Sequence, residues 1–369
     1  MLKSKKINFI DLSVNNRDIK SIAEEQLLTT HSLGYLDFLA DDLQPTIIRF
    51  GIALEEKDNY KLYRYKLQDL IKFYHFFKQK QNAVVLFHGF PFPIRFWLLR
   101  NLMSNKIKWI IQHHAGEPSK NWLKCVIQKI AYGKANAYLF VTKAQAKNFI
   151  TKGLVTSEEH VFEIMECSTP FQLKDKLESR KKIKIDSNVL TLLWVGGLDK
   201  NKDRMTMLNA ILDFKTKGAV FSLYLFYNRN DLLHKVQEFI VKNDMESFVF
   251  LKGKIENGKL EDWYNAADFY IACSHTEGSG GAMAEATACG CIPIATTIPS
   301  FLFMTDNGKV GMHFEKGNWS NLAEKLSHLN QIDIESERIK THQIFKAKTS
   351  FEAIGIRTSE VIKRLATQG

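Results

Sequence analysis

The stretch 268–295 constrains the fold of this chain more than any other part of its sequence. Residues 268–273 form a short apolar run, which is typical of a buried strand. A loop with three glycines follows, and glycine permits the tight turn that such a loop needs. Residues 282–288 are good helix formers and end before Gly290, a favoured left-handed residue after a helix. Because an extended segment restarts at Ile292, the order predicts a parallel α/β sheet with a helix N-terminus at its carboxyl edge.

Two carboxylates belong to this segment. Glu277 falls in the glycine loop, and Glu285 lies about one turn inside the helix. The N–H groups at the start of the helix can hold a phosphate, whereas carboxylates suit the hydroxyl groups of a sugar or a ribose. The alternative is a loop acid and a solvated helical glutamate with no ligand.

This pattern resembles the E-x7-E signature of the family-4-like retaining glycosyltransferases, which have the GT-B fold. Glu277, seven intervening residues and Glu285 carry the resemblance, together with the glycines, the helix and the following strand. The resemblance implies two Rossmann-like, doubly wound parallel-sheet domains that face a cleft, with a C-terminal helix that crosses back to the first domain.

The remaining sequence divides in agreement with that fold. Short apolar runs alternate with helical patterns on both sides of a charged stretch that is poor in strand signals. We expect a first, acceptor-side domain at 1–172, a linker at 173–186 and a nucleotide-sugar-binding domain at 187–350. The amphipathic tail, 351–369, is the helix expected on the first domain.

The turn after residues 193–195 is similar to the family's glycine turn at the donor diphosphate. Lys202 matches the family's lysine, but Gly197 stands where an arginine is usual, so Lys200 and Arg204 are candidates to supply the missing charge. The resemblance implies catalytic roles for Glu277 and Lys202. It also implies a donor-binding set of Gly196, Gly197, Lys200, Arg204, Lys254, Ile255, Ser279, Gly280, Gly281, Ala282 and Glu285.

Two histidine clusters follow predicted strands of the first domain. His88-Gly89 ends one strand and His113-His114 ends another, and ligands of open α/β sheets bind at such strand ends. By resemblance one of His113 and His114 is catalytic, close to donor sugar and acceptor, with His114 preferred. We assign His88 and Gly89 to the acceptor side, with a structural role as the alternative. No third ligand has metal-site spacing, so we expect no metal and no cofactor besides the donor substrate.

The formal net charge of +11 indicates an anionic partner. Segments 60–78 and 95–100 interleave aromatic and basic residues, as a peripheral face on an anionic membrane does, or as ordinary helices do. We find no RNA-binding module and expect no nucleic acid partner. Since no signal-peptide core and no apolar run of about eighteen residues occurs, we expect a cytoplasmic protein, with the inner face of the membrane as its site of any peripheral contact.

These features predict a retaining, metal-independent glycosyltransferase. It moves a sugar from a nucleotide-diphosphate sugar to a glycan, lipid-linked or other acceptor, in the synthesis of cell-surface polysaccharide or glycoconjugates. Two alternatives remain at this point. One is a nucleotide-sugar epimerase on the same fold, and the other is a non-catalytic, basic protein that binds glycan or nucleic acid, for which the missing arginine at Gly197 is the best support.

Overall fold

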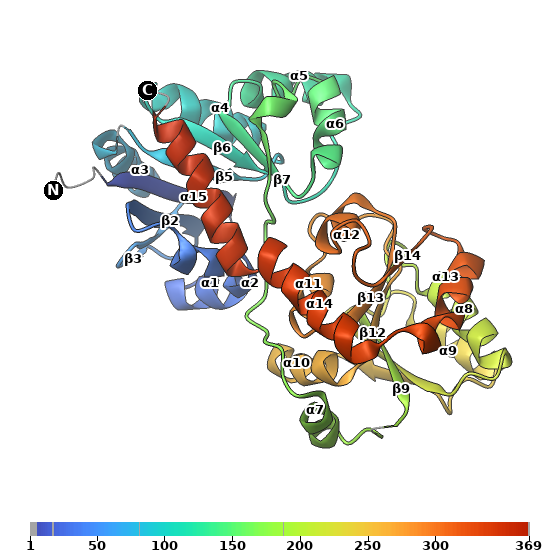
Figure 1. Ribbon diagram of the computed structural model, residues 1–369. Helices are drawn as coiled ribbons and strands as arrows, with labels where there is room; N and C mark the ends of the chain where they lie inside the picture. Colours follow the sequence, from blue (N-terminus) through green and yellow to red (C-terminus); the bar gives the residue numbers. More distant parts are fainter. Residues whose placement is uncertain (1–5, 17, 81, 187, 368–369) are drawn as a thin grey trace. The chain divides into compact units, whose positions relative to one another are not determined.

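The computed structural model describes residues 6–16, 18–80, 82–186 and 188–367, and they form two compact units (Figure 1). Unit 1 comprises Met1–Ser168 and Phe351–Gly369, and unit 2 comprises Thr169–Ser350. Each unit is built on one sheet whose strands are mainly parallel, so the predicted pair of parallel α/β domains is confirmed.

The sheet of unit 1 has eight strands in the order β3-β4-β2-β1-β5-β6-β7-β8. All neighbouring strands are parallel except β3, which pairs antiparallel with β4 at the edge. The strands are β1 (Ile7–Asn16), β2 (Leu43–Gly51), β3 (Glu55–Lys57), β4 (Tyr60–Arg64), β5 (Val84–His88), β6 (Lys108–Gln112), β7 (Ala137–Phe140) and β8 (Val161–Glu163). The helices are α1 (Ile22–Leu28), α2 (Thr30–Leu33), η1 (Gly34–Phe38), α3 (Leu67–Gln79), α4 (Pro93–Leu102), α5 (Trp122–Tyr132), α6 (Lys143–Thr151), η2 (Glu158–His160) and α15 (Phe351–Thr367).

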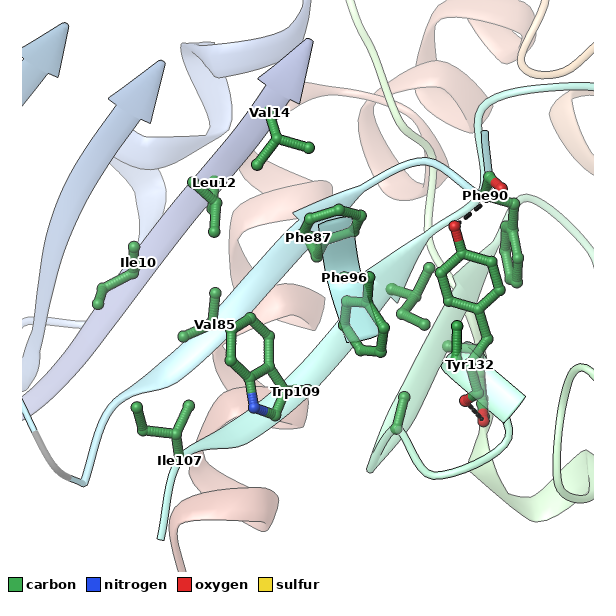
Figure 2. Close-up of a cluster of buried hydrophobic side chains, with 14 of the residues drawn as sticks. Ile10, Leu12, Val14, Val85, Phe87, Phe90, Phe96, Ile107, Trp109 and Tyr132 are labelled. Carbon is green, nitrogen blue, oxygen red and sulfur yellow. Dashed lines mark hydrogen bonds between the residues drawn. The ribbon is translucent and has the colours of Figure 1, made fainter. Parts of the chain in front are cut away.

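The core of unit 1 is aromatic. Phe87, Phe96 and Trp109 pack edge to face between the central strands and α4, and Tyr132 closes the cluster with a 2.8 Å hydrogen bond from its hydroxyl to the Phe90 carbonyl (Figure 2). Such rings bury a large apolar area each, which anchors the ends of β5 and β6. The packed core therefore holds the polar residues at the ends of those strands in fixed positions.

The sheet of unit 2 has six strands, all paired in parallel, in the order β11-β10-β9-β12-β13-β14. The strands are β9 (Leu190–Gly196), β10 (Phe221–Tyr227), β11 (Val249–Gly253), β12 (Phe269–Ala272), β13 (Ile292–Thr296) and β14 (Met312–Phe314). The helices are α7 (Lys176–Ile183), α8 (Arg204–Thr216), α9 (Leu233–Lys242), α10 (Asn257–Ala266), α11 (Gly281–Ala288), α12 (Pro299–Met304), α13 (Trp319–Ser327), η3 (Leu329–Gln331) and α14 (Ile334–Lys348). The predicted strand, glycine loop, helix and strand are β12, the loop, α11 and β13.

The segment 173–186, predicted to be the linker between the domains, contains helix α7 and lies within unit 2, which already begins at Thr169. The charged side chains of α7 bind carboxylates of unit 2. Arg180 donates to Asp268 at 2.7 Å with both side chains 4% exposed, and Lys182 lies 2.5 Å from Asp262. The charged side chains of α7 thus form specific ion pairs, and the helix is packed against the rest of unit 2.

The segment 60–78 is not one amphipathic face. Its first residues form strand β4, in which Tyr60 and Tyr63 are buried, and only the later residues form helix α3. The bases of this strand are paired: Lys61 contacts Glu56 at 2.5 Å, and Arg64 contacts Asp69 at 2.6 Å. The aromatic and basic pattern of residues 60–64 therefore belongs to a strand inside the sheet, between β3 and β2.

Helix α15 belongs to unit 1, as predicted for the tail. It packs on η1 and contacts β1 and β5 (Figure 1). Gly355 makes the close approach to η1 possible, because a Cβ there would stand 2.7 Å from the Tyr35 carbonyl oxygen and 2.7 Å from the Phe38 Cβ. A glycine is therefore required at this crossing.

The substitution Gly355→Ala is expected to destabilise unit 1 by about 1–3 kcal/mol, because backbone atoms of η1 cannot move away from the new methyl group. Gly258→Ala is the matched control, since that helical glycine has no atom within 4 Å of an added Cβ and alanine favours the helix by about 0.5–1 kcal/mol. Denaturant unfolding measures both. A Gly355→Ala variant as stable as the native chain would contradict this account of the crossing.

Candidate functional site

Two loops of unit 2 meet at the carboxyl edge of its sheet. One, 197–203, joins β9 to α8, and the other, 273–280, joins β12 to α11. Because β9 and β12 are adjacent parallel strands, both loops leave the same edge. Asn201 ties them together: its carbonyl accepts the His275 N–H at 2.9 Å, and its side chain accepts the Thr276 N–H at 3.1 Å and donates to the Thr276 carbonyl at 2.9 Å. The two loops therefore act as one structural piece.

Lys202 and Glu277, the two residues predicted to be catalytic in this domain, form an ion pair across these loops. The Lys202 Nζ lies 2.5 Å from the Glu277 Oε1, and the two side chains are 21% and 15% exposed. The Lys202 side chain also passes over Gly196, where an added Cβ would stand 3.4 Å from its Cδ. A cation and a carboxylate are thus presented side by side at the sheet edge, where a phosphate and a hydroxyl group are their natural partners.

The N-terminus of α11 lies directly after this pair in the sequence. Gly280 is its N-cap with φ +72°, and a Cβ there would stand 2.8 Å from the Phe301 ring, so backbone conformation and packing both require glycine. Gly281 and Ala282 begin the helix, and no atom lies within 4 Å of a Cβ placed on Gly281. The first N–H groups of a helix have no partner within the helix, so an anion can bind at this open start.

A cavity of about 520 Å³ opens beside these groups in unit 2. Five predicted donor-binding residues line it, namely Gly196, Gly197, Lys254, Ile255 and Glu285. Its other lining residues are Val195, Phe226, Tyr227, Asn228, Arg229, Gly253, Asn257 and Leu260. A cavity of this size suits a small organic ligand.

Glu285 is the acidic group of this cavity. Burial raises its pKa from 4.5 to about 7, although the Tyr264 hydroxyl, which donates to its Oε2 at 3.1 Å, opposes the shift. Tyr264 is buried on α10 and was not anticipated from the sequence. The cavity therefore holds a carboxyl group that changes its protonation near neutral pH.

The two candidates for the missing charge at Gly197 lie outside the cavity lining. Lys200 is exposed on the loop, and Arg204 is buried beneath it with its Nη1 donating to the Asp199 carbonyl at 2.6 Å. Ser279 is buried within the other loop.

The guanidinium that does reach Gly197 belongs to Arg229, which sequence reasoning missed. A Cβ on Gly197 would stand 2.7 Å from both the Nε and the Nη2 of Arg229. Arg229 also forms an ion pair with Asp199, and the Leu198 N–H donates to its carbonyl at 3.1 Å. The only signal in the sequence was the absence of glycines after β10, in the turn 228–230, and that signal does not identify a partner.

In unit 1, polar side chains from the middle of β1, from the ends of β5 and β6 and from the segment after β8 form a hydrogen-bonded chain. His88 Nε2 contacts the Asp11 carboxylate at 2.8 Å, His88 Nδ1 lies 3.1 Å from His114 Nε2, and His114 Nδ1 contacts the Glu166 carboxylate. The two rings and the two carboxylates therefore form one continuous hydrogen-bonded chain.

The inner end of this chain is fully buried. Asp11 is also held by Arg49 Nη2 at 2.6 Å and by the Tyr35 hydroxyl at 2.8 Å, and Arg49 Nε lies 3.2 Å from Glu25. Burial alone would raise the pKa of Asp11, but the charges of His88 and Arg49 and these hydrogen bonds lower it well below its ordinary value. Burial lowers the pKa of His88, although Asp11 opposes this. Gly89 follows His88 with φ +90° and donates its N–H to the Gln112 carbonyl at 3.0 Å.

The two adjacent histidines after β6 have different surroundings. His113 is 3% exposed, stacks on Phe140 with ring centroids 4.6 Å apart, and has its pKa lowered by burial. The His114 side chain is 42% exposed. His113 is therefore part of the aromatic core, and His114 is the one at the sheet edge.

A second cavity, of about 650 Å³, lies in unit 1 near these histidines. Apolar side chains of α4, α5 and α6, among them Ile94, Ile127 and Phe149, line much of it. Arg95, Lys124 and Glu117 add charge to its wall. Such a cavity suits an amphiphilic ligand.

Among the residues that the structure describes, no group of three or more His, Cys, Asp or Glu side chains is arranged to hold a metal ion. Within the same residues, no helix combines the length and the apolar character needed to cross a bilayer.

Unit 2 is similar to a known family of proteins. Residues 175–343 match the family model described as glycosyl transferases group 1. An uncharacterized glycosyltransferase of Methanocaldococcus jannaschii is 26% identical over 175 residues, which are 47% of this chain and 48% of the relative, so the match spans about half of each protein.

Solved structures resemble the whole chain. Sucrose-phosphate synthase from Thermosynechococcus elongatus has a TM-score of 0.71 at 13% identity, over 99% of this chain and 100% of that one. A glycosyltransferase from Rickettsia africae has a TM-score of 0.72 at 16% identity, over 99% and 100%. HepE from Anabaena, solved in complex with UDP and glucose, has a TM-score of 0.70 at 12% identity, over 97% and 100%. These likenesses confirm the predicted GT-B fold class.

Because His113 is buried and His114 is partly exposed, we expect their replacement to change the free energy of unfolding by different amounts. His113→Ala is expected to lower the free energy of unfolding by about 2–4 kcal/mol, because it leaves a cavity among packed rings. His114→Ala is expected to cost about 1 kcal/mol or less, because its ion pair is partly solvated. Denaturant unfolding compares them, and equal costs would contradict the assignment of His113 to the core.

The raised pKa of Glu285 predicts a pH-dependent stability. Its folded-state pKa lies above the ordinary value, so its contribution to stability is fully present below about pH 4.5 and is lost as the pH rises through about 7. Between pH 5 and pH 8 the native chain is expected to lose up to about 3 kcal/mol relative to Glu285→Gln, which cannot ionise. The control Glu246→Gln, at an exposed site of unit 2, keeps the native pH profile. Parallel profiles for native chain and Glu285→Gln would show that Glu285 is not desolvated.

Proposed function

We propose that this chain, which carries a glycosyl transferases group 1 domain in unit 2, is a retaining glycosyltransferase. It moves a sugar from a nucleotide-diphosphate sugar to a glycan or lipid-linked acceptor, in the synthesis of cell-surface polysaccharide or glycoconjugates. The observation that carries the proposal is the combination, at one sheet edge, of the Lys202–Glu277 pair, the open start of α11 and a cavity that holds Glu285.

In this proposal each part of the donor is bound by the protein group whose chemistry suits it. The base lies in the cavity near Lys254 and Ile255, and Glu285 accepts hydrogen bonds from the ribose hydroxyls. The diphosphate lies against Lys202 and the N–H groups of Gly280, Gly281 and Ala282. UDP is the first nucleotide to test, because HepE, which shares the fold, was solved with UDP and glucose.

Transfer requires that the nucleoside diphosphate leave with growing negative charge. Lys202 and the N–H groups at the start of α11 stabilise that charge as it develops, and donors fixed in advance need no reorganisation during the reaction. Glu277 keeps the Lys202 ammonium in place and accepts hydrogen bonds from hydroxyls of the donor sugar. The acceptor attacks on the face that the leaving group vacates, and the diphosphate takes the acceptor's proton, so no protein nucleophile is needed. With this positive charge at hand, the proposed reaction uses no metal ion.

Arg229 removes the main argument for a non-catalytic protein. The missing arginine at Gly197 suggested that the donor site had lost a charge, but the Arg229 guanidinium lies over Gly197 and lines the same cavity. We assign Arg229 to the diphosphate, with Gly197 leaving space for it. Its ion pair with Asp199 holds the side chain near this position before a donor binds.

Unit 1 is assigned to the acceptor. His114 and His88 lie at the ends of its strands, and in this proposal a hydroxyl group of the acceptor takes the place of one hydrogen-bond partner of the half-exposed His114 ring. Gly89 keeps the chain close to these rings without adding a side chain. A cytoplasmic location belongs to the same proposal.

A thermal-shift screen with UDP, GDP, dTDP and ADP sugars tests the function, because a ligand bound only by the folded state raises its melting temperature. We expect one nucleotide series to raise it, and Arg229→Ala to shrink that shift. With the donor known, product analysis by NMR gives the anomeric configuration, and an inverted product would contradict retention. No shift with any nucleotide would refute donor binding.

Removal of either charge of the catalytic pair is expected to abolish most transfer. Lys202→Ala and Glu277→Gln should each lower kcat about 100-fold or more, the scale seen when one stabilising group of a transition state is lost. Lys235→Ala, which removes an exposed lysine of α9, is the matched control. The measurement is initial-rate transfer by variants whose melting transition shows that they are folded. Native kcat in either variant would remove that residue from the mechanism.

A further inference from the structure

Helix α4 of unit 1 presents an apolar stripe to solvent. Ile94, Leu98 and Leu102 recur every four residues and are 60%, 44% and 62% exposed, and Trp97 beside them is 41% exposed. Only Phe96 of this helix is buried. Residues at such spacing lie on one side of a helix, so α4 is amphipathic with its apolar side outward.

Helix α5 repeats the arrangement. Trp122 is 75% exposed, Leu123 54% and Ile130 58%, and Val126 and Ile127 lie between them on the same side. Ala131 and Tyr132, at its end, are its buried residues. Helices α4 and α5 contact each other (Figure 1), and Ile94 of one stripe and Ile127 of the other line the same cavity, so the two stripes adjoin in one surface, which we call the α4–α5 face. Such a contiguous apolar surface marks a site of interaction in a soluble fold.

The segment that carries α4 and α5 is strongly basic. The segment 93–134 contains eight lysines and arginines and one acidic residue, Glu117, so it holds a formal charge of +7 of the chain's +11. Lys120, Lys124 and Lys129 are exposed next to the stripe of α5. The Glu117 carboxylate accepts a hydrogen bond from Asn148 Nδ2 at 2.8 Å. The partner of this surface must therefore be apolar and anionic at once.

We propose that the α4–α5 face docks on an anionic lipid bilayer. Tryptophan and aliphatic side chains enter the boundary between headgroups and acyl chains, while lysines at the rim contact the anionic headgroups. Protein interfaces are depleted in lysine, so this composition favours a lipid surface over a protein partner. The segment 95–100 thus keeps the membrane role considered from sequence, together with α5.

The docked face has a consequence for the cavity of unit 1. Ile94 and Ile127 belong both to the face and to the cavity wall, so docking brings the cavity to the lipid surface. This suits an acceptor with an apolar anchor. That consequence rests on the proposed function, whereas docking itself does not.

Vesicle co-sedimentation tests the docking directly. The native chain is expected to sediment with vesicles of phosphatidylcholine and phosphatidylglycerol, and to remain largely in solution with pure phosphatidylcholine. Trp122→Glu is expected to weaken the binding at least about tenfold, since it removes a buried ring from the bilayer and adds a repelled charge. Trp319→Glu is the matched control, because both tryptophans are exposed, begin a helix and follow an asparagine N-cap.

A variant with fewer lysines measures the electrostatic contribution to vesicle binding. Lys120→Gln with Lys124→Gln is expected to lower the affinity for anionic vesicles several-fold, and raising the salt from about 0.1 to 1 M is expected to act in the same direction. Lys235→Gln with Lys242→Gln, two exposed lysines of unit 2, leaves the affinity unchanged. All variants are first compared with the native chain by their melting transitions.

Three results would overturn the proposal. They are equal binding of the native chain and Trp122→Glu, equal binding to neutral and anionic vesicles, and a dimer in light scattering that Trp122→Glu dissociates. The last result would assign the α4–α5 face to a second copy of the chain. Vesicle binding is read without any sugar donor, so its failure is distinguishable from a failure of the glycosyl transfer.

Discussion

Parallel strand pairing is the constraint on which both units depend. In a parallel sheet every strand ends at the same edge, so residues far apart in the sequence are delivered to one place. In unit 2, Lys202 and Glu277 are 75 positions apart and meet at 2.5 Å because β9 and β12 are neighbours. In unit 1 the same constraint brings His88 and His114 within 3.1 Å after β5 and β6. The strand order of each sheet therefore decides which of its functional side chains lie close together.

The charged side chains at the two sheet edges differ in how deeply they are buried. Asp11 and Arg49 of unit 1 are buried, and buried charges are tolerated only when they are fully paired, so this cluster fixes the position of His88. The Lys202–Glu277 pair of unit 2 is partly exposed, so its ions can exchange partners when a charged ligand arrives. The side chains of the unit 1 cluster are thus fixed in position, whereas the two ions of unit 2 can exchange partners with a charged ligand.

Sequence reasoning succeeded where a signal was local and failed where the signal depended on contacts. The order of β12, the glycine loop, α11 and β13 followed from periodicity and turn residues, because each of these properties belongs to one short segment. Helix α7 was missed, because its charged residues look like a solvated linker until Asp262 and Asp268 are placed beside them. Strand β4 was misread for a similar reason, since its bases look solvated until Glu56 of β3 and Asp69 of α3 are placed beside them.

The sequence by itself determined the class of the fold, the glycine loop that begins α11, and the choice of Lys202, Glu277 and Glu285 as the residues to examine. Each depends on spacing along the chain and on the chemistry of the side chain. Only the tertiary structure decided that Arg229 is the cation over Gly197, and that His113 belongs to the core while His114 stands at the sheet edge. The roles of these residues depend on which strands are neighbours and which rings pack together. The sequence does not contain this information, because His113 and His114 are adjacent in the chain and chemically identical.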